Sequence, residues 1–279
     1  MISMILATLG RKKEVDDFFL HLENQETKDF EIIVVDQNQD DCLNEILKKY
    51  SSLYSIHHIK TKIKGLSRAR NIGLKHATGD VICFPDDDCY YGKGTLKQVK
   101  NVFSKNKNTD CIIIKSCDFE GNNLLPVIKE NEHDLSEAEF WKVGISFALF
   151  FSASAVKAAG NFDEKLGVGS GTLYGSGEET DFLYRVYRQK KNLRYMPSIK
   201  VHHPNKDADI THVIVDRAYL YGCGCGRVLK KNNAHWLLKT RFLIRPLGGS
   251  ILAVIGFNFM LAKKRYATFK GRLRGLQDE

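Results

Sequence analysis

Three consecutive aspartates, Asp86, Asp87 and Asp88, follow an apolar run at residues 81–84 that has the composition of a buried strand. Adjacent carboxylates repel one another and raise each other's pKa unless a positive group lies among them. A divalent cation suits that place, because Mg²⁺ and Mn²⁺ prefer carboxylate oxygens and often share their shell with substrate phosphates. The pattern therefore favours a Mn²⁺ or Mg²⁺ site with Asp86 and Asp88 as ligands. A solvated acidic turn is the alternative.

A possible phosphate-binding segment lies upstream, at residues 65–73, which read Gly-Leu-Ser-Arg-Ala-Arg-Asn-Ile-Gly. Ser67 is expected to cap a helix here, with Arg68 and Arg70 in the first turn. The free N–H groups of such a helix start attract phosphate, and arginine adds bidentate contacts. The alternative is a capped helix whose arginines lie in solvent.

A second group of carboxylates, Glu178, Glu179 and Asp181, opens a later helical stretch and offers candidate general bases. Residues 176–179, Ser-Gly-Glu-Glu, also have the form of a capping box, in which Glu179 would bond back to the helix start. One side chain does not easily serve both purposes. Glu178 and Asp181 therefore remain open as alternatives.

Two histidines, His202 and His203, follow an expected strand at residues 193–201. A neutral imidazole is a ligand for Mn²⁺, but strand side chains alternate, so only one of the two can face a site. His203 is preferred, because it precedes Pro204, where the strand must end. His202 is the alternative.

Strand and helix signals alternate through the first 118 residues, which predicts an α/β fold with a mostly parallel sheet flanked by helices. Strands are expected at residues 3–8, 30–36, 54–59, 80–85, 110–115 and 145–152, and helices at 13–23, 43–50, 67–75, 94–103 and 208–231. Ligands of such sheets bind outside the carboxyl ends of the strands. Asp36 and Asp86 fall at two of those ends.

In order and spacing, residues 31–36, 65–73 and 77–88 resemble the donor-binding half of the glycosyltransferase family 2 enzymes, which have the GT-A fold. Residues 160–164 and 175–185 resemble two later motifs of that family. Five motifs in the right order make a specific match to the family, whereas any one of them alone would be weak evidence. The resemblance implies a GT-A type single domain followed by a helical C-terminal appendage.

The resemblance also implies a reaction, namely metal-dependent, inverting transfer of a sugar from a nucleotide-diphosphate sugar, with a UDP-sugar favoured, to an acceptor hydroxyl. A saccharide or lipid-linked acceptor, in surface polysaccharide or lipid-linked glycan synthesis, is expected. A non-catalytic nucleotide-sugar-binding protein is one alternative. A sugar-nucleotide pyrophosphorylase is another, although residues 9–13 after the first strand are poor in the glycine that such enzymes use.

Matching positions carry the family's roles onto this sequence. Thr8 and Asp36 match contacts of the nucleoside, and Arg68 and Arg70 match the helix that faces the diphosphate or sugar. Glu179 matches the position that is usually the catalytic Asp, from which it departs by one methylene. The remaining matches are at the donor and metal motif, where Asp86 and Asp88 are the two acidic ends and Asp87 lies between them.

Three segments follow from these matches: a nucleotide-sugar half at residues 1–118, an acceptor half at 119–206, and a basic, partly apolar helical region at 207–279. The net charge is +9, yet residues 217–279 alone carry 13 lysines and arginines against 2 acidic residues. A positive excess confined to one segment favours an anionic membrane surface as partner. Nucleic acid is not expected, since no basic and aromatic stacking platform is present.

The apolar stretch at residues 247–262 is short of the roughly 20 residues that a spanning helix needs. We expect it to lie on or dip into the cytoplasmic leaflet; a helix packed on the catalytic domain or on a dimer partner is the alternative. Small residues at 219–226 favour close helix packing.

The cysteines indicate a reducing compartment. Seven of them are scattered through the chain with no CxxC pair, and the first residues lack the features of a signal peptide. The expected location is therefore cytoplasmic and peripheral, on the inner face of the cell membrane.

Overall fold

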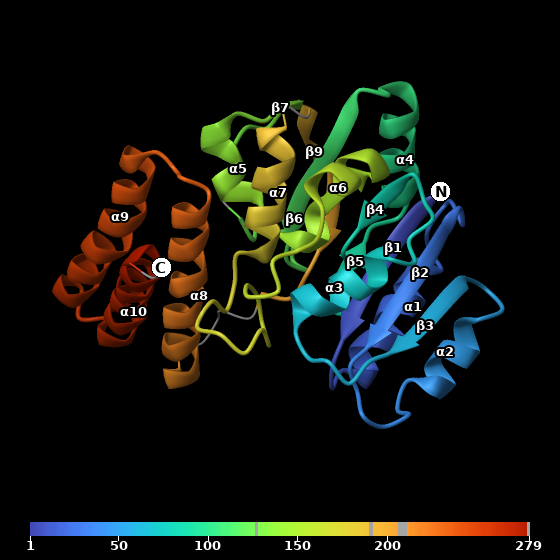
Figure 1. The fold of residues 1–279 in the computed structure, drawn as a ribbon, viewed down its shortest axis with the longest axis horizontal. Helices are drawn as coiled ribbons and strands as arrows, with labels where there is room; N and C mark the ends of the chain where they lie inside the picture. Colours follow the sequence, from blue (N-terminus) through green and yellow to red (C-terminus); the bar gives the residue numbers. More distant parts are fainter. Residues whose placement is uncertain (126–127, 190–191, 206–210, 278–279) are drawn as a thin grey trace. The chain divides into compact units, whose positions relative to one another are not determined.

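A computed structural model describes residues 1–125, 128–189, 192–205 and 211–277 of the chain (Figure 1). The chain forms two compact units. The first unit comprises Met1–Lys64, Arg68–Asn161 and Phe182–Asn205, and the second comprises Gly65–Ser67, Phe162–Asp181 and Lys206–Glu279. The predicted boundary between residues 206 and 207 lies outside the described residues.

One sheet runs through the first unit in the order β3-β2-β1-β4-β8-β6-β9-β5, with β7 also paired to β9. Its strands are β1 (Ile2–Thr8), β2 (Phe30–Asp36), β3 (Ser55–Lys60), β4 (Val81–Cys83), β5 (Tyr90–Tyr91), β6 (Thr109–Cys117), β7 (His133–Asp134), β8 (Leu149–Ser152) and β9 (Asn192–His202). The neighbours β3, β2, β1 and β4 are parallel, whereas β8 runs antiparallel to both β4 and β6. The predicted α/β class is confirmed, and its parallel character belongs chiefly to these first four strands.

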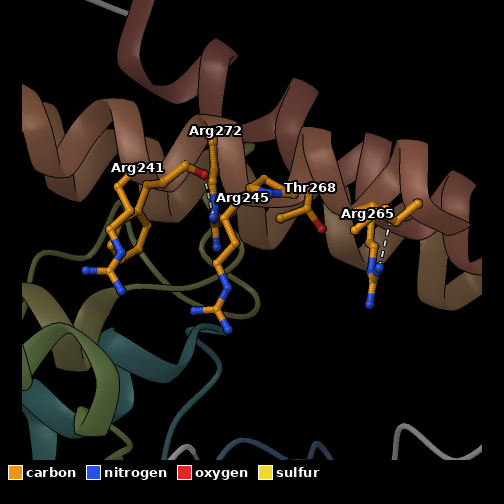
Figure 2. A pocket seen from close by; sticks show the side chains of 9 residues that line it. Arg241, Arg245, Arg265, Thr268 and Arg272 are labelled. Atoms are coloured by element: carbon orange, nitrogen blue, oxygen red, sulfur yellow. Dashed lines mark hydrogen bonds between the residues drawn. The ribbon is translucent and has the colours of Figure 1, made fainter.

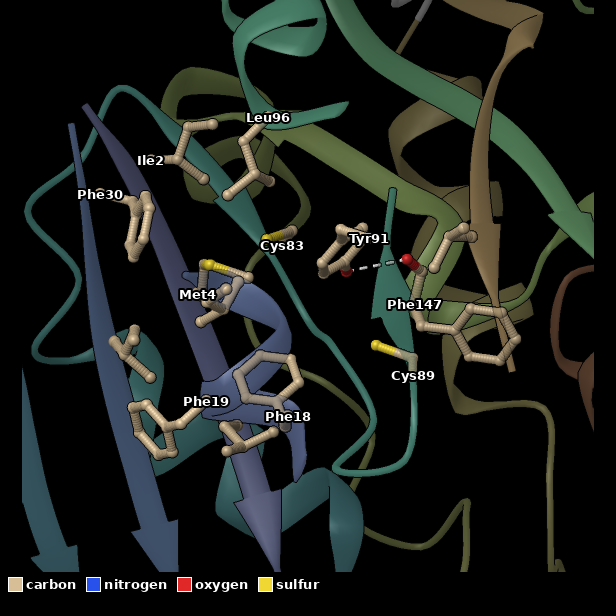
Figure 3. Close-up of a cluster of buried hydrophobic side chains, with 14 of the residues drawn as sticks. Ile2, Met4, Phe18, Phe19, Phe30, Cys83, Cys89, Tyr91, Leu96 and Phe147 are labelled. Carbon is tan, nitrogen blue, oxygen red and sulfur yellow. Dashed lines mark hydrogen bonds between the residues drawn. The ribbon is translucent and has the colours of Figure 1, made fainter. Parts of the chain in front are cut away.

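Helices cover both faces of this sheet, and the alternation of side chains along β1 shows how. The helices are α1 (Lys12–Leu22), α2 (Asn44–Tyr50), α3 (Leu66–Leu74), α4 (Thr95–Lys105), α5 (Glu137–Val143), α6 (Ala153–Ala159) and α7 (Glu178–Arg188), with a 3₁₀ turn, η1 (Ser146–Ala148). Met4 belongs to the buried cluster that contains Phe18 and Phe19 of α1 (Figure 3). Ile5 instead lies against Gly73 of α3. Because successive strand residues point to opposite faces, α1 and α3 cover opposite sides of β1.

A buried tyrosine ties the short strand β5 to η1. The hydroxyl of Tyr91 donates a hydrogen bond of 2.9 Å to the carbonyl of Phe147 (Figure 3). Burial raises the pKa of Tyr91 well above its usual value, so the group stays a neutral donor. This bond fixes the position of the turn that carries Ser146 and Phe147.

The helices α8 (His212–Lys231), α9 (Trp236–Ile255) and α10 (Phe259–Gln277) make up most of the second unit. Glycines let α8 and α10 approach closely. A Cβ atom at Gly271 would lie 2.1 Å from the carbonyl oxygen of Tyr219, and one at Gly275 would lie 2.1 Å from that of Cys223. The close packing expected from the small residues at 219–226 is present.

The apolar stretch at residues 247–262 is divided between two helices. α9 ends at Ile255 and α10 begins at Phe259, and between them Phe257 has a positive φ of 56°. Among the residues that the structure describes, no helix is both long enough and apolar enough to cross a membrane.

Replacing Gly275 by alanine should destabilise the second unit, because the new methyl group would overlap the backbone of α8. Overpacking of this kind costs about 1–3 kcal/mol. Gly248→Ala is the matched control, since nothing lies within 4 Å of a Cβ at that position of α9, and alanine is favoured over glycine in a helix by roughly 0.5–1 kcal/mol. Urea unfolding followed by circular dichroism measures both; equal stability of the two variants would contradict the packing described.

Candidate active site

The carboxyl ends of three neighbouring parallel strands meet at one edge of the sheet. Thr8 ends β1 and pairs in register with Asp36, which ends β2. β4 pairs with β1 on its other side, so the acidic residues that follow β4 reach the same edge. The Thr8 hydroxyl donates to Oδ2 of Asp87 at 2.8 Å. The predicted strand-end location of these residues is therefore observed.

Cationic side chains surround the three aspartates. Nη1 of Arg11 lies 2.6 Å from Oδ2 of Asp88 and 3.2 Å from Oδ1 of Asp87. Nη2 of Arg70 lies 3.6 Å from Oδ1 of Asp86. Burial raises the pKa of Asp87 to about 6, while the Thr8 hydroxyl and the charge of Arg11 act in the opposite direction. The acidic run is thus a partly buried cluster whose negative charges are paired with arginines of the same chain, unlike a solvated turn.

His203 joins this cluster through the pairing of β5 with β9. Tyr90 pairs with His202 in antiparallel register, so the residues that precede β5 lie beside those that follow β9. Nε2 of His203 lies 2.9 Å from Oδ1 of Asp88 and 3.9 Å from Oδ2 of Asp86. Asp86, Asp88 and His203 can each offer one ligand atom, and these atoms lie within 4.8 Å of one another.

The imidazole of His203 is held by a ring stacked on its plane and by a contact at Nδ1. The ring stacks on Phe147 with centroids 4.6 Å apart and an interplanar angle of 3°. Nδ1 lies 2.9 Å from the carbonyl oxygen of Pro204. Donation from Nδ1 to this carbonyl leaves the Nε2 lone pair available to a metal.

His202, the alternative to His203, makes different contacts. Its Nδ1 lies 2.9 Å from the carbonyl oxygen of Asp118, and its ring lies beside that of Tyr90. Of the two histidines, the group that could hold a metal contains His203.

Asp36 is fully buried, and both of its carboxylate oxygens have partners in this structure. Oδ1 accepts from the backbone N–H of Asn38 at 2.9 Å and from its side-chain amide at 2.8 Å. Oδ2 lies 3.0 Å from Nε2 of His58, which projects from β3. Any nucleoside contact by Asp36 therefore takes place beside His58, a residue that the sequence patterns did not single out.

The two arginines of α3 differ in surroundings. Arg70 is 1% exposed and lies against Asp86 and the ring of Phe84, so in this structure it supports the acidic cluster. Arg68 is more exposed, and its Nη1 donates to the Lys64 carbonyl at 3.1 Å. The expectation that Ser67 caps this helix was wrong, because the hydroxyl of Ser67 donates to a distant backbone carbonyl and the helix begins one residue earlier.

The carboxylates at residues 178–181 belong to the second unit and start α7. Asp181 is fully buried, and its two oxygens accept from Nζ of Lys231 at 3.1 Å and from the amide of Asn232 at 2.9 Å. Glu178 is buried against Gly167, where an added Cβ would lie 2.9 Å from the carboxyl group. Glu179 is half-buried. Among the three, Asp181 has a clear structural role.

The start of α7 is not the expected capping box. The Ser176 hydroxyl donates to the carbonyl of Tyr221 at 3.0 Å. The first helical hydrogen bond runs from the Asp181 N–H to the carbonyl of Gly177, at 2.8 Å. Since the cap position falls on Gly177, Glu179 is not at the third position after the cap that a capping box requires.

Arg11 and the two η1 residues are further contributors that the sequence patterns missed. The hydroxyl of Ser146 donates to Oδ1 of Asp86 at 3.3 Å, and Phe147 supports His203. Residues 145–152 were expected to form one strand, but a 3₁₀ turn precedes β8 there and turns these side chains toward the acidic cluster. Arg11 follows β1 closely, so the strand-end rule that indicated Asp36 and Asp86 would have found it as well.

The model of the glycosyl transferase family 2 matches residues 3–155, more than half of the chain. The poly(ribitol-phosphate) beta-N-acetylglucosaminyltransferase TarS of Staphylococcus aureus is 29% identical over 126 residues, which cover 44% of this chain and 22% of that protein. The GalNAc(5)-diNAcBac-PP-undecaprenol beta-1,3-glucosyltransferase of Campylobacter jejuni is 27% identical over 208 residues, which cover 67% of this chain and 65% of that protein. The chain thus spans less than two thirds of either relative.

Solved structures share the fold. Residues 1–349 of S. aureus TarS in complex with UDP-GlcNAc align with a TM-score of 0.63 and 17% identity, covering 98% of this chain and 91% of that one. The mannosyltransferase PcManGT from Pyrobaculum calidifontis, in complex with GDP-Man and Mn²⁺, aligns with a TM-score of 0.63 and 12% identity, covering 100% of this chain and 87% of that one. With the family model matched across the strands that precede the acidic cluster, this chain belongs to glycosyl transferase family 2, and it has the GT-A fold.

Proposed function

We propose that the protein is a metal-dependent, inverting glycosyltransferase that moves a sugar from a UDP-sugar to a hydroxyl of a saccharide or lipid-linked acceptor, in the synthesis of surface polysaccharide or lipid-linked glycan. The observation that carries this proposal is the group formed by Asp86, Asp88 and His203 at the strand ends. The acceptors named for the S. aureus and C. jejuni relatives, and the UDP-GlcNAc and Mn²⁺ in the solved structures, support it. Family membership favours transfer over the binding-protein and pyrophosphorylase alternatives.

The donor set of the acidic cluster fits Mn²⁺ or Mg²⁺. Two carboxylates and one imidazole converge within 4.8 Å, and imidazole suits Mn²⁺ better than Mg²⁺. When bound, the ion would supply positive charge to the diphosphate of the donor. The Ser146 hydroxyl and the guanidinium of Arg70 hold the Asp86 carboxylate in place for that role.

The remaining donor contacts come from the same edge of the sheet. We assign the nucleoside to Asp36 and the diphosphate or sugar to Arg68, which is more exposed than the buried Arg70. Thr8 acts through Asp87, because its hydroxyl donates to that carboxylate. These assignments make residues 1–118 the donor half and 119–206 the acceptor half.

Glu179 is the proposed general base. The acceptor hydroxyl approaches the anomeric carbon opposite the leaving diphosphate, and Glu179 takes its proton as the new carbon–oxygen bond forms. The bond to the diphosphate breaks, and its electron pair stays on the leaving oxygen. Because the acceptor attacks from the face opposite the leaving group, the anomeric centre is inverted. Asp181 is a weaker candidate, because Lys231 and Asn232 already bind both of its oxygens.

We further propose that residues 217–279 attach the enzyme to the anionic, cytoplasmic face of the cell membrane. The net charge of +11 in this region supports this attachment.

Replacing Asp88 by asparagine should abolish Mn²⁺-dependent thermal stabilisation by UDP and lower sugar transfer at least about 100-fold, since the leaving charge loses its electrostatic support. The matched control is Asp41→Asn, which removes a carboxylate that is 74% exposed and pairs with Lys60 at the surface. Thermal shift and donor turnover across a panel of nucleotide sugars measure both effects. Wild-type transfer by Asp88→Asn, or transfer by the wild type after all divalent cations have been removed by a chelator, would contradict the metal assignment.

Replacing Glu179 by glutamine should lower kcat by roughly 10²–10⁴ and leave UDP binding unchanged, because only proton removal is lost. Asp181→Asn should instead lower the free energy of unfolding by about 1.5–3 kcal/mol, because the buried carboxylate loses its charge-assisted hydrogen bond from Lys231. Steady-state kinetics and urea unfolding separate the two outcomes. Near-wild-type kcat in Glu179→Gln would shift the base to Glu178.

A further inference from the structure

A cavity of about 540 Å³ lies between α9 and α10 of the second unit, and four arginines line it (Figure 2). Arg241 and Arg245 come from α9, and Arg265 and Arg272 come from α10, together with the hydroxyl of Thr268. No part of the proposed sugar-transfer chemistry uses these residues.

Helical spacing explains why the arginines meet. Arg241 and Arg245 are four residues apart, and Arg265, Thr268 and Arg272 are separated by three and four, so each set forms one row along its helix. Figure 2 shows the guanidinium groups of both rows projecting to the same side. The two rows face one cavity and do not diverge into solvent.

The positive charge of the cavity is held in place without being neutralised by the surrounding helices. Arg265 donates to the carbonyl of Gly249 at 2.7 Å, and Arg272 donates to that of Phe242 at 2.6 Å. Carbonyl acceptors orient a guanidinium but leave its charge. From residue 217 to residue 277 the sequence contains no acidic residue at all. Convergent arginines of this kind match the oxygens of a phosphate group.

A row of apolar side chains lies next to the arginine row on α9. Leu237, Ile244, Ile251 and Ile255 are spaced by seven, seven and four residues, which keeps them on one side of the helix, and they are 56–67% exposed. Single exposed apolar residues are ordinary, but several along one side of a helix mark an interaction surface. An apolar face bordered by arginines is typical of a helix that lies in a membrane interface.

We propose that this cavity binds the phosphate of an anionic membrane lipid, while the apolar row of α9 contacts its acyl chains. The phosphate of a phospholipid and the diphosphate of a lipid carrier present the same oxygens to the arginines. The proposal rests on the proposed function only for the presence of a lipid-linked acceptor. Lipid binding itself requires neither Mn²⁺ nor the donor sugar.

Flotation of the full chain with vesicles tests this proposal. Vesicles contain phosphatidylcholine alone, phosphatidylcholine with phosphatidylglycerol, or phosphatidylcholine with a polyprenyl diphosphate at matched negative charge. We expect binding to the anionic vesicles and not to phosphatidylcholine alone. Stronger binding to the diphosphate vesicles identifies the carrier of the acceptor as the ligand, and equal binding identifies phospholipid. Absence of binding to both anionic vesicles overturns the proposal.

Variants that remove equal charge inside and outside the cavity distinguish lipid binding in the cavity from general attraction of a basic protein to anionic vesicles. Arg241→Gln with Arg245→Gln should weaken vesicle binding by roughly tenfold or more, given the contribution of each basic residue at an anionic surface. Lys263→Gln with Lys270→Gln removes the same charge from exposed positions of α10 outside the cavity and should weaken binding less. Equal losses in the two variants would show unspecific attraction and overturn the site.

The apolar row has its own variant, Ile251→Ser with Ile255→Ser, which should also reduce binding to anionic vesicles. Thermal stabilisation by UDP and Mn²⁺ reports on the first unit in every variant and should not change. Failure of the wild type to bind UDP would contradict the proposed function and leave the vesicle result standing. Unchanged vesicle binding by the serine variant would contradict the role given to the apolar row.

Discussion

Repulsion among three adjacent carboxylates at the end of β4 is the constraint on which the first unit depends. The side chains of Asp87 and Asp88 are 9% and 8% exposed and that of Asp86 is 32% exposed, so water screens the run only in part, and positive groups must come from the protein or from a cation. Arg11 and Arg70 supply two such groups. They come from the start of α1 and from α3, so the acidic run is tolerable only when these elements have docked on the sheet. Folding and assembly of the site are therefore one event.

His203 shows how a very short strand controls a distant contact. β5 has only two residues, yet its antiparallel pairing with β9 fixes which histidine lies beside Asp88. The Tyr91 bond to Phe147 then places an aromatic ring under the imidazole. Side-chain alternation alone did not decide whether His202 or His203 faces the acidic cluster. The register of β5 on β9 distinguishes the two.

Much of the donor edge could be predicted from the sequence, because buried strands and strand-end carboxylates leave local patterns. Asp36, Asp86 and Asp88 fall where the parallel-sheet rule puts them. His58 was not found, since its meaning comes only from the neighbouring strand that carries Asp36.

Local sequence patterns were not sufficient to predict the hydrogen bonds at the helix starts. Ser67 and Ser176 both have the form of caps, yet each donates its hydroxyl to a backbone carbonyl far along the chain. Tertiary hydrogen bonds outcompeted local ones there. The turn at η1 was likewise expected as strand, because its apolar residues satisfy either conformation.

Lys231 joins Asp163 and Asp181, at 2.6 and 3.1 Å, and so fastens the start of α7 to α8. The backbone of α8 also lies directly on Ser176, where a Cβ at Gly224 would come within 2.1 Å of the serine carbonyl oxygen. The segment that carries Glu179 is thus supported by its packing against α8. An enzyme shortened before α8 to improve its solubility would lose this support. It would lose the basic surface of the C-terminal helices as well. For protein engineering, surface substitutions on α9 are consequently the better route to a soluble, active enzyme.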